Sequence, residues 1–63
     1  MNISIDTIEL AIETIMRQYA ADSGMAKNED TPLQQKWYYK SLAQMDKKAL
    51  TELKAALKEI KDD

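Results

Sequence analysis

The sequence contains no cysteine and no histidine. Without cysteine the chain forms no disulfide, and without histidine it lacks the commonest zinc ligand and the commonest general base. Its single glycine, Gly24, excludes a glycine-rich phosphate-binding loop. We therefore expect no catalytic site, no structural metal and no cofactor.

Long apolar runs are also missing. Nowhere do 18 apolar residues follow one another, and the first residues, MNISIDTIEL, have neither the basic start nor the apolar run of a signal peptide. These absences predict a cytoplasmic protein with no membrane partner.

The charge balance is acidic, with 9 Lys and Arg against 11 Asp and Glu and a net charge of −2. A protein that binds nucleic acid usually carries a basic surface, so nucleic acid is not the expected partner. Residues 1–31 carry 2 bases and 6 acids, a net charge of −4, whereas residues 32–63 carry 7 bases and 5 acids, a net charge of +2. The two halves can therefore attract each other, within one chain or between two.

A chain of 63 residues forms one domain, here residues 1–63. A domain of this size buries only about 60% of the surface that its unfolded chain exposes. Because no disulfide or metal is expected, stability has to come from well-packed helices and from oligomerisation. The 44% of apolar residues is enough for a helical core.

A first helix is predicted over residues 6–22. Asp6 followed by Glu9 resembles a capping box, and Asp22-Ser23-Gly24 is a typical helix end. The apolar residues between them recur at helical spacing: Ile8, Ile12, Ile15 and Tyr19.

A second helix is predicted over residues 32–61, with Thr31 as N-cap and Pro32 in the first turn. Asp46 is an alternative N-cap, which would divide this segment in two. One continuous helix is favoured because its apolar stripe keeps its spacing across that point: Tyr38, Leu42, Met45, Ala49, Leu53, Ala56 and Ile60. At about 1.5 Å per residue the first helix covers only about half of the second, so another chain has to cover the rest.

Three adjacent rings, Trp37, Tyr38 and Tyr39, span roughly 200° of the second helix. Tyr38 belongs to the apolar stripe, and the other two rings form its flanks. One interpretation places all three in the core and in a dimer interface. The other makes Leu33, Trp37 and Tyr39 part of a groove for a partner's helix.

The first five residues alternate polar and apolar, as a half-buried strand does. A strand this short needs a partner, and the same strand of a second subunit is the candidate; a frayed terminus is the alternative. The predicted fold is thus mainly α, with a short N-terminal strand, in an intertwined homodimer. Its expected interface contains Ile3, Ile5, Tyr38, Leu42, Met45, Leu50, Leu53, Leu57 and Ile60.

Two polar series carry weaker alternatives. Glu9 and Glu13 share a helix face and could form a carboxylate pair for a metal or for acid–base chemistry, although such pairs are usually a solvated face. The lysines of the second helix could contact nucleic acid, but acidic residues are interleaved with them. These lysines are Lys36, Lys40, Lys47, Lys48, Lys54, Lys58 and Lys61.

The segments IELAIETIMRQYAADSGMA and KWYYKSL, with the length of 63, resemble the small early proteins encoded between the exonuclease and excisionase genes of bacteriophage lambda and related temperate phages. The resemblance covers the whole chain but includes no catalytic signature. It implies an early-expressed dimeric protein, acting in the host cytoplasm, that favours lytic development through a host or phage protein.

Overall fold

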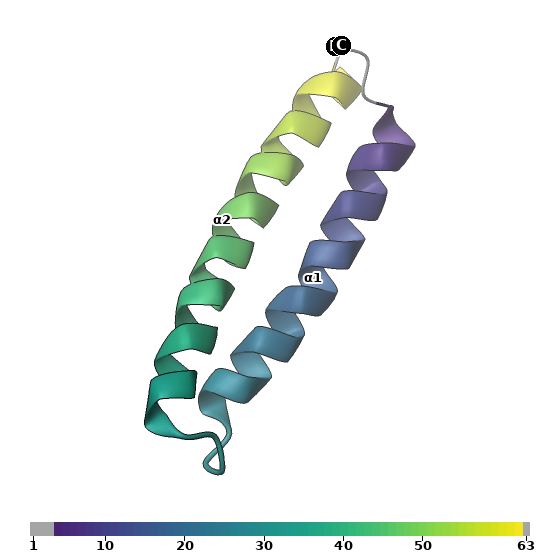
Figure 1. The fold of residues 1–63 in the computed structure, drawn as a ribbon. Helices are drawn as coiled ribbons and strands as arrows, with labels where there is room; N and C mark the ends of the chain where they lie inside the picture. Colours follow the sequence, from purple (N-terminus) through teal and green to yellow (C-terminus); the bar gives the residue numbers. More distant parts are fainter. Residues whose placement is uncertain (1–3, 63) are drawn as a thin grey trace.

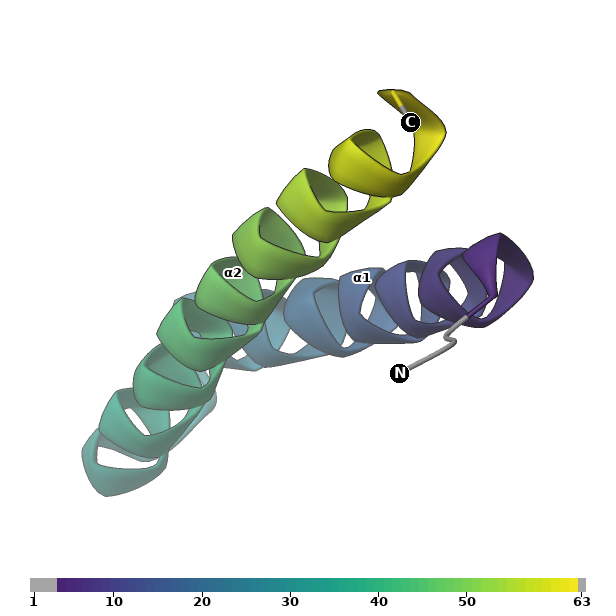
Figure 2. The ribbon, with the colours of Figure 1, turned by 90° about the horizontal axis from the view of Figure 1, so that it is seen from above.

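The computed structural model describes residues 4–62, which form two α-helices. Helix α1 spans Ile5–Lys27 and helix α2 spans Leu33–Asp62. The helices run antiparallel, side by side, as one hairpin (Figure 1). Seen from above, their axes are inclined to each other (Figure 2). The predicted two-helix architecture is confirmed, and residues 4–62 contain no strand.

Helix α1 begins earlier than predicted because Ser4 caps it. The Ser4 side chain accepts a hydrogen bond from the backbone N–H of Thr7 at 3.1 Å, which satisfies one of the free donors of the first turn. Asp6 lies inside that turn and is not the cap. Ile5 is helical, so the predicted strand is wrong at this residue. The rest of that prediction, including Ile3, lies outside the described residues.

Helix α1 also ends five residues later than predicted. Gly24 does not stop it, since the structure contains no glycine with a positive φ. Asn28 caps the C-terminus: its N–H donates to the Met25 carbonyl at 3.4 Å, and its side chain accepts from the N–H of Asp30 at 2.9 Å. This Asx turn starts the connection of residues 28–32.

Helix α2 is continuous through Asp46, so the prediction of one long helix is confirmed and the alternative break is excluded. It begins one residue later than predicted, with the Pro32 carbonyl accepting from the Lys36 N–H at 2.9 Å. At about 1.5 Å per residue α1 is about three-quarters as long as α2. The expectation that α1 covers only half of α2 is therefore wrong.

The two helices face each other along what we call the seam. Its positions alternate in steps of three and four residues, the heptad spacing of paired helices. On α1 they are Ile5, Ile8, Ile12, Ile15, Tyr19, Asp22 and Ala26; on α2 they are Lys36, Tyr39, Ala43, Asp46, Leu50, Leu53, Leu57 and Ile60. Ile8 and Leu50, 4% and 9% exposed, are its most deeply buried apolar residues.

The predicted apolar stripe of α2 is displaced from the seam over its first half. Tyr38 and Met45, predicted to face inward, are 60% and 67% exposed, whereas Tyr39 and Asp46, one position further along, are half-buried. The predicted stripe is the most apolar row of residues on α2, whereas the row that faces α1 includes Lys36 and Asp46. Towards the C-terminus the predicted stripe and the seam coincide at Leu53, which is half-buried, and at Ile60, which is exposed.

The hairpin leaves much of its surface uncovered. Its accessible surface is 5250 Å², against about 4,100 Å² for a compact protein of the same mass. Its radius of gyration is 14.3 Å, against about 11 Å for a compact domain of this length. Two helices bury one stripe each, so the remaining apolar side chains stay in contact with solvent.

The position of Gly24 within α1 leads to a stability prediction. A methyl group added at this glycine would meet nothing within 4 Å. Gly24→Ala should therefore raise the free energy of unfolding by about 0.5–1 kcal/mol, because alanine loses less backbone freedom on folding. Urea melts followed by circular dichroism measure the change. Unchanged or lower stability would contradict the helical assignment of residue 24.

The position of the seam leads to a second prediction. Leu50→Ala should cost about 2–5 kcal/mol, because it removes buried methyl groups from the seam. Met45→Ala should change the stability of the single hairpin by less than about 0.5 kcal/mol, because Met45 is exposed. Melts at concentrations too low for association test the pair. The opposite ranking would place the seam where the sequence pattern predicted it.

Candidate interaction surfaces

One side of the hairpin carries an apolar surface, which we call the apolar flank. Its α2 residues each stand directly before a seam position: Tyr38, Leu42, Met45, Ala49 and Ala56. Its α1 residues are Ala11 and Met25, which precede the seam positions Ile12 and Ala26. The bulky side chains lie in the half of the flank near the connection of residues 28–32. Most of the alanines lie in the half away from this connection.

The opposite side carries lysines at seven-residue spacing, and we call it the lysine edge. Lys40, Lys47, Lys54 and Lys61 each follow a seam position of α2. Glu9 follows a seam position of α1, and its carboxylate lies 3.6 Å from Lys61 Nζ. This contact shows that residues following the seam on both helices meet on one side. The residues preceding it therefore share the other side, which holds the apolar flank together with the polar Gln18, Glu52 and Glu59.

The residues of the predicted partner groove lie in two different environments. Leu33 and Trp37 are 65% and 67% exposed and are one helical turn apart. Tyr39 is half-buried in the seam and meets the Tyr38 ring edge to face, with centroids 5.4 Å apart. Of the three adjacent rings, Tyr39 thus lies in the seam, Tyr38 lies on the apolar flank and Trp37 lies on the outside of the hairpin.

The residues of the predicted dimer interface are also divided between the two surfaces. Tyr38 and Met45 lie exposed on the apolar flank, and Leu42 lies there half-buried. Five others lie in the seam of the single chain: Ile5, Leu50, Leu53, Leu57 and Ile60. Ile3 lies outside the described residues. An interface between two copies would thus draw mainly on the first group.

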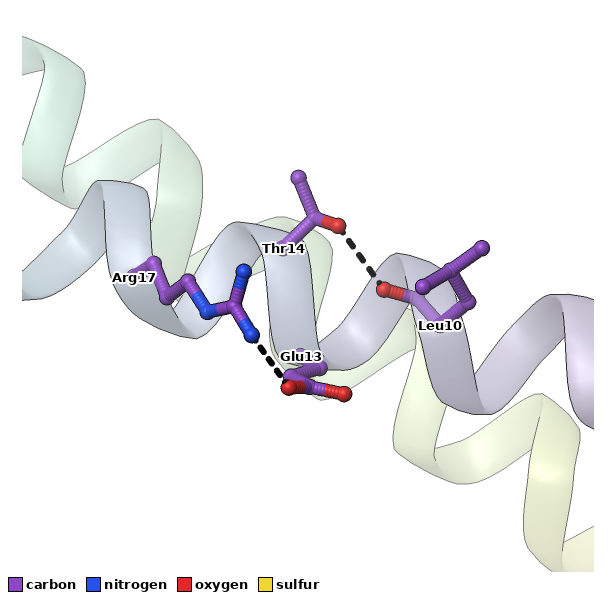
Figure 3. Close-up of polar contacts among 4 residues, drawn as sticks. All are labelled: Leu10, Glu13, Thr14 and Arg17. Atoms are coloured by element: carbon purple, nitrogen blue, oxygen red, sulfur yellow. Dashed lines mark hydrogen bonds and ion pairs between the residues drawn. The ribbon is translucent and has the colours of Figure 1, made fainter.

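The carboxylates of α1 that could form a metal pair each have a cation nearby. Glu13 accepts a hydrogen bond from Arg17 one turn later, on the outer face that Figure 3 shows. On the same face the Thr14 hydroxyl donates to the Leu10 carbonyl at 2.9 Å. Glu9 pairs with Lys61 across the hairpin. Residues 4–62 contain no cluster of three potential metal ligands.

Sequence reasoning missed a pair of carboxyl groups inside the seam. Asp22 and Asp46 occupy half-buried seam positions on the two helices, and the neighbouring Asp22 carboxyl group raises the pKa of Asp46 above its ordinary value. The Oδ2 atom of Asp46 is shielded from solvent and has no hydrogen-bond partner. Asp46 lies seven residues from both Tyr39 and Leu53, so it shares their helix face. This spacing predicts a buried Asp46 only if that face is known to contact α1.

No protein-family model, curated protein or solved structure matches the chain. In the described part of the chain, neither helix combines the length and apolar character of a membrane span. The surfaces therefore have to be interpreted from their own chemistry.

The exposure of Trp37 can be tested by fluorescence. Acrylamide should quench this single tryptophan almost as efficiently in the folded protein as in urea, because its ring is 67% exposed. Quenching should not depend on protein concentration if the copies associate through the apolar flank. Protection that grows with concentration would place Trp37 in a contact between copies.

Proposed function

We propose that this chain is a non-enzymatic interaction protein that acts as a two-fold homodimer, in which the apolar flanks of two hairpins pack together. The observation that supports this is the exposure of Tyr38 and Met45 on one side of a hairpin with few buried apolar residues. A partner that covered this side would remove them from water, which is favourable by about 25 cal/mol per Å² of apolar surface.

The excess of accessible surface suits a second copy of the chain. The hairpin exposes roughly 1,100 Å² more than a compact protein of its mass, and a stable interface buries about 800 Å² on each partner. A two-fold axis perpendicular to the helices sets the bulky half of one flank against the small half of the other. Tyr38 and Met45 of one copy would then lie near Ala11 and Ala56 of its twin. Because α1 covers most of α2, this dimer does not require intertwined chains.

Sedimentation tests the homodimer and its surface together. The wild-type protein should sediment as a dimer at micromolar concentration, and Met45→Glu should shift it to a 7.2 kDa monomer, because a carboxylate buried without a partner costs several kcal/mol. Gln44→Glu is the matched control, since it adds the same charge at an exposed neighbour outside the flank. A wild-type monomer, or equal effects of the two substitutions, would contradict the proposal.

We further propose that Leu33 and Trp37, with the lysine edge beside them, bind a second protein. Tryptophan is enriched among the residues that dominate binding energy, and two apolar side chains one turn apart can anchor an amphipathic helix. The resemblance to early phage proteins suggests that this partner is a host or phage factor in the host cytoplasm and that binding favours lytic development.

The seven-residue spacing of the lysines supports a second candidate, a nucleic-acid or transcription accessory protein. Capture from host lysate with and without nuclease separates the two. Under the protein-interaction proposal, capture survives nuclease and is lost in Trp37→Ala, while Lys47→Ala weakens it only moderately. Loss of all partners after nuclease would favour the alternative.

A further inference from the structure

The most unusual polar contact in the hairpin is the Asp22–Asp46 pair described above. Helix seams bury apolar side chains, yet here each helix contributes a carboxyl group at the same level. The neighbouring seam positions are Tyr19 and Ala26 on α1 and Ala43 and Leu50 on α2. None of these four side chains carries a positive charge that could compensate two carboxylates.

Two ionised carboxylates cannot hydrogen-bond to each other, because both only accept. A single proton changes this: the protonated group donates to the other, and the repulsion between the two charges disappears. The Oδ2 atom of Asp46 is shielded from solvent and has no hydrogen-bond partner, so a proton shared with a neighbouring carboxyl group would satisfy it. The ionised pair is therefore the costly state of the folded hairpin.

We propose that Asp22 and Asp46 form a proton-operated switch in the seam, in which one shared proton closes the half of the hairpin near the connection and its loss loosens that half. The switch is independent of the homodimer, because both carboxyl groups belong to one chain.

The pKa of Asp46 agrees with this geometry. It is raised above its ordinary value of 3.8, first by the hydrogen bond to the Asp22 side chain, then by loss of hydration and by repulsion from the Asp22 charge. A raised pKa in the folded state means that folding takes up a proton. The stabilisation is therefore complete below about pH 3.8 and is lost as the pH rises through the raised pKa.

Other charged groups do not offset the pair. The two ion pairs found within residues 4–62, Glu13–Arg17 and Glu9–Lys61, involve neither aspartate. The closest lysines in sequence, Lys47 and Lys48, are exposed. The other titratable side chain at a neighbouring seam position of α1 is Tyr19.

Asparagine at position 46 mimics the protonated carboxyl group, because its amide donates to Asp22 at any pH. Asp46→Asn should therefore melt at a higher temperature than the wild type at pH 7, and the difference should vanish at low pH. Asp22→Asn should behave in the same way, and the double variant should gain little more. Glu52→Gln is the matched control, since it removes one negative charge from an exposed position of α2. Its melting curve should differ from that of the wild type by a small, nearly constant amount.

Carbon-13 NMR titration of the aspartate carboxyl groups measures the proton directly. In the wild type one carboxyl of the pair should titrate above the other aspartates, and Asp22→Asn should return Asp46 towards its ordinary range. An Asp46 titration that Asp22→Asn does not change would overturn the switch, as would Asp46→Asn and Glu52→Gln giving the same pH profile. If one aspartate variant fails to fold, the other variant and the wild-type titration still decide.

Discussion

The packing of α1 against α2 along the seam determines every other surface of this protein. Steps of three and four residues place one stripe of each helix inside, with Ile8 and Leu50 most deeply buried. Once the seam is set, the apolar flank lies among the residues that precede seam positions, and the lysine edge lies among those that follow them. Two helices can bury only these stripes, so large apolar side chains elsewhere remain at the surface.

Much of the fold could be predicted from local signals. The regular spacing of apolar residues across Asp46, without glycine or proline, correctly indicated one long α2. The end of α1 could not be predicted as well, because Gly24 and Asn28 are both plausible stops. The helix continues past the glycine, whose helical conformation costs only about 0.5–1 kcal/mol relative to alanine, and ends at the Asx turn of Asn28.

The side of α2 that faces α1 was harder to predict than its length. Periodicity gives the spacing of a buried stripe, but two neighbouring stripes of α2 have the same spacing. The stripe through Tyr38 and Met45 is the more apolar, whereas the seam passes through Tyr39 and Asp46. The side-chain packing against α1 decides between the two stripes, and the hydrophobicity pattern of α2 alone carries no information about this packing. For the same reason the Asp22–Asp46 contact was not expected from the sequence.

In a hairpin, the number of residues between two facing seam positions increases from the connection to the opposite end. Ala26 and Ala43, near the connection, are separated by a short stretch of chain, whereas Glu9 and Lys61 are nearly a whole chain apart. Closing a short loop costs less entropy than closing a long one. The seam should therefore form first near the connection and then extend towards the opposite end of the hairpin. Asp22 and Asp46 lie in the part that closes early. Their protonation should therefore act mainly on the rate of folding, and the Glu9–Lys61 contact mainly on the rate of unfolding.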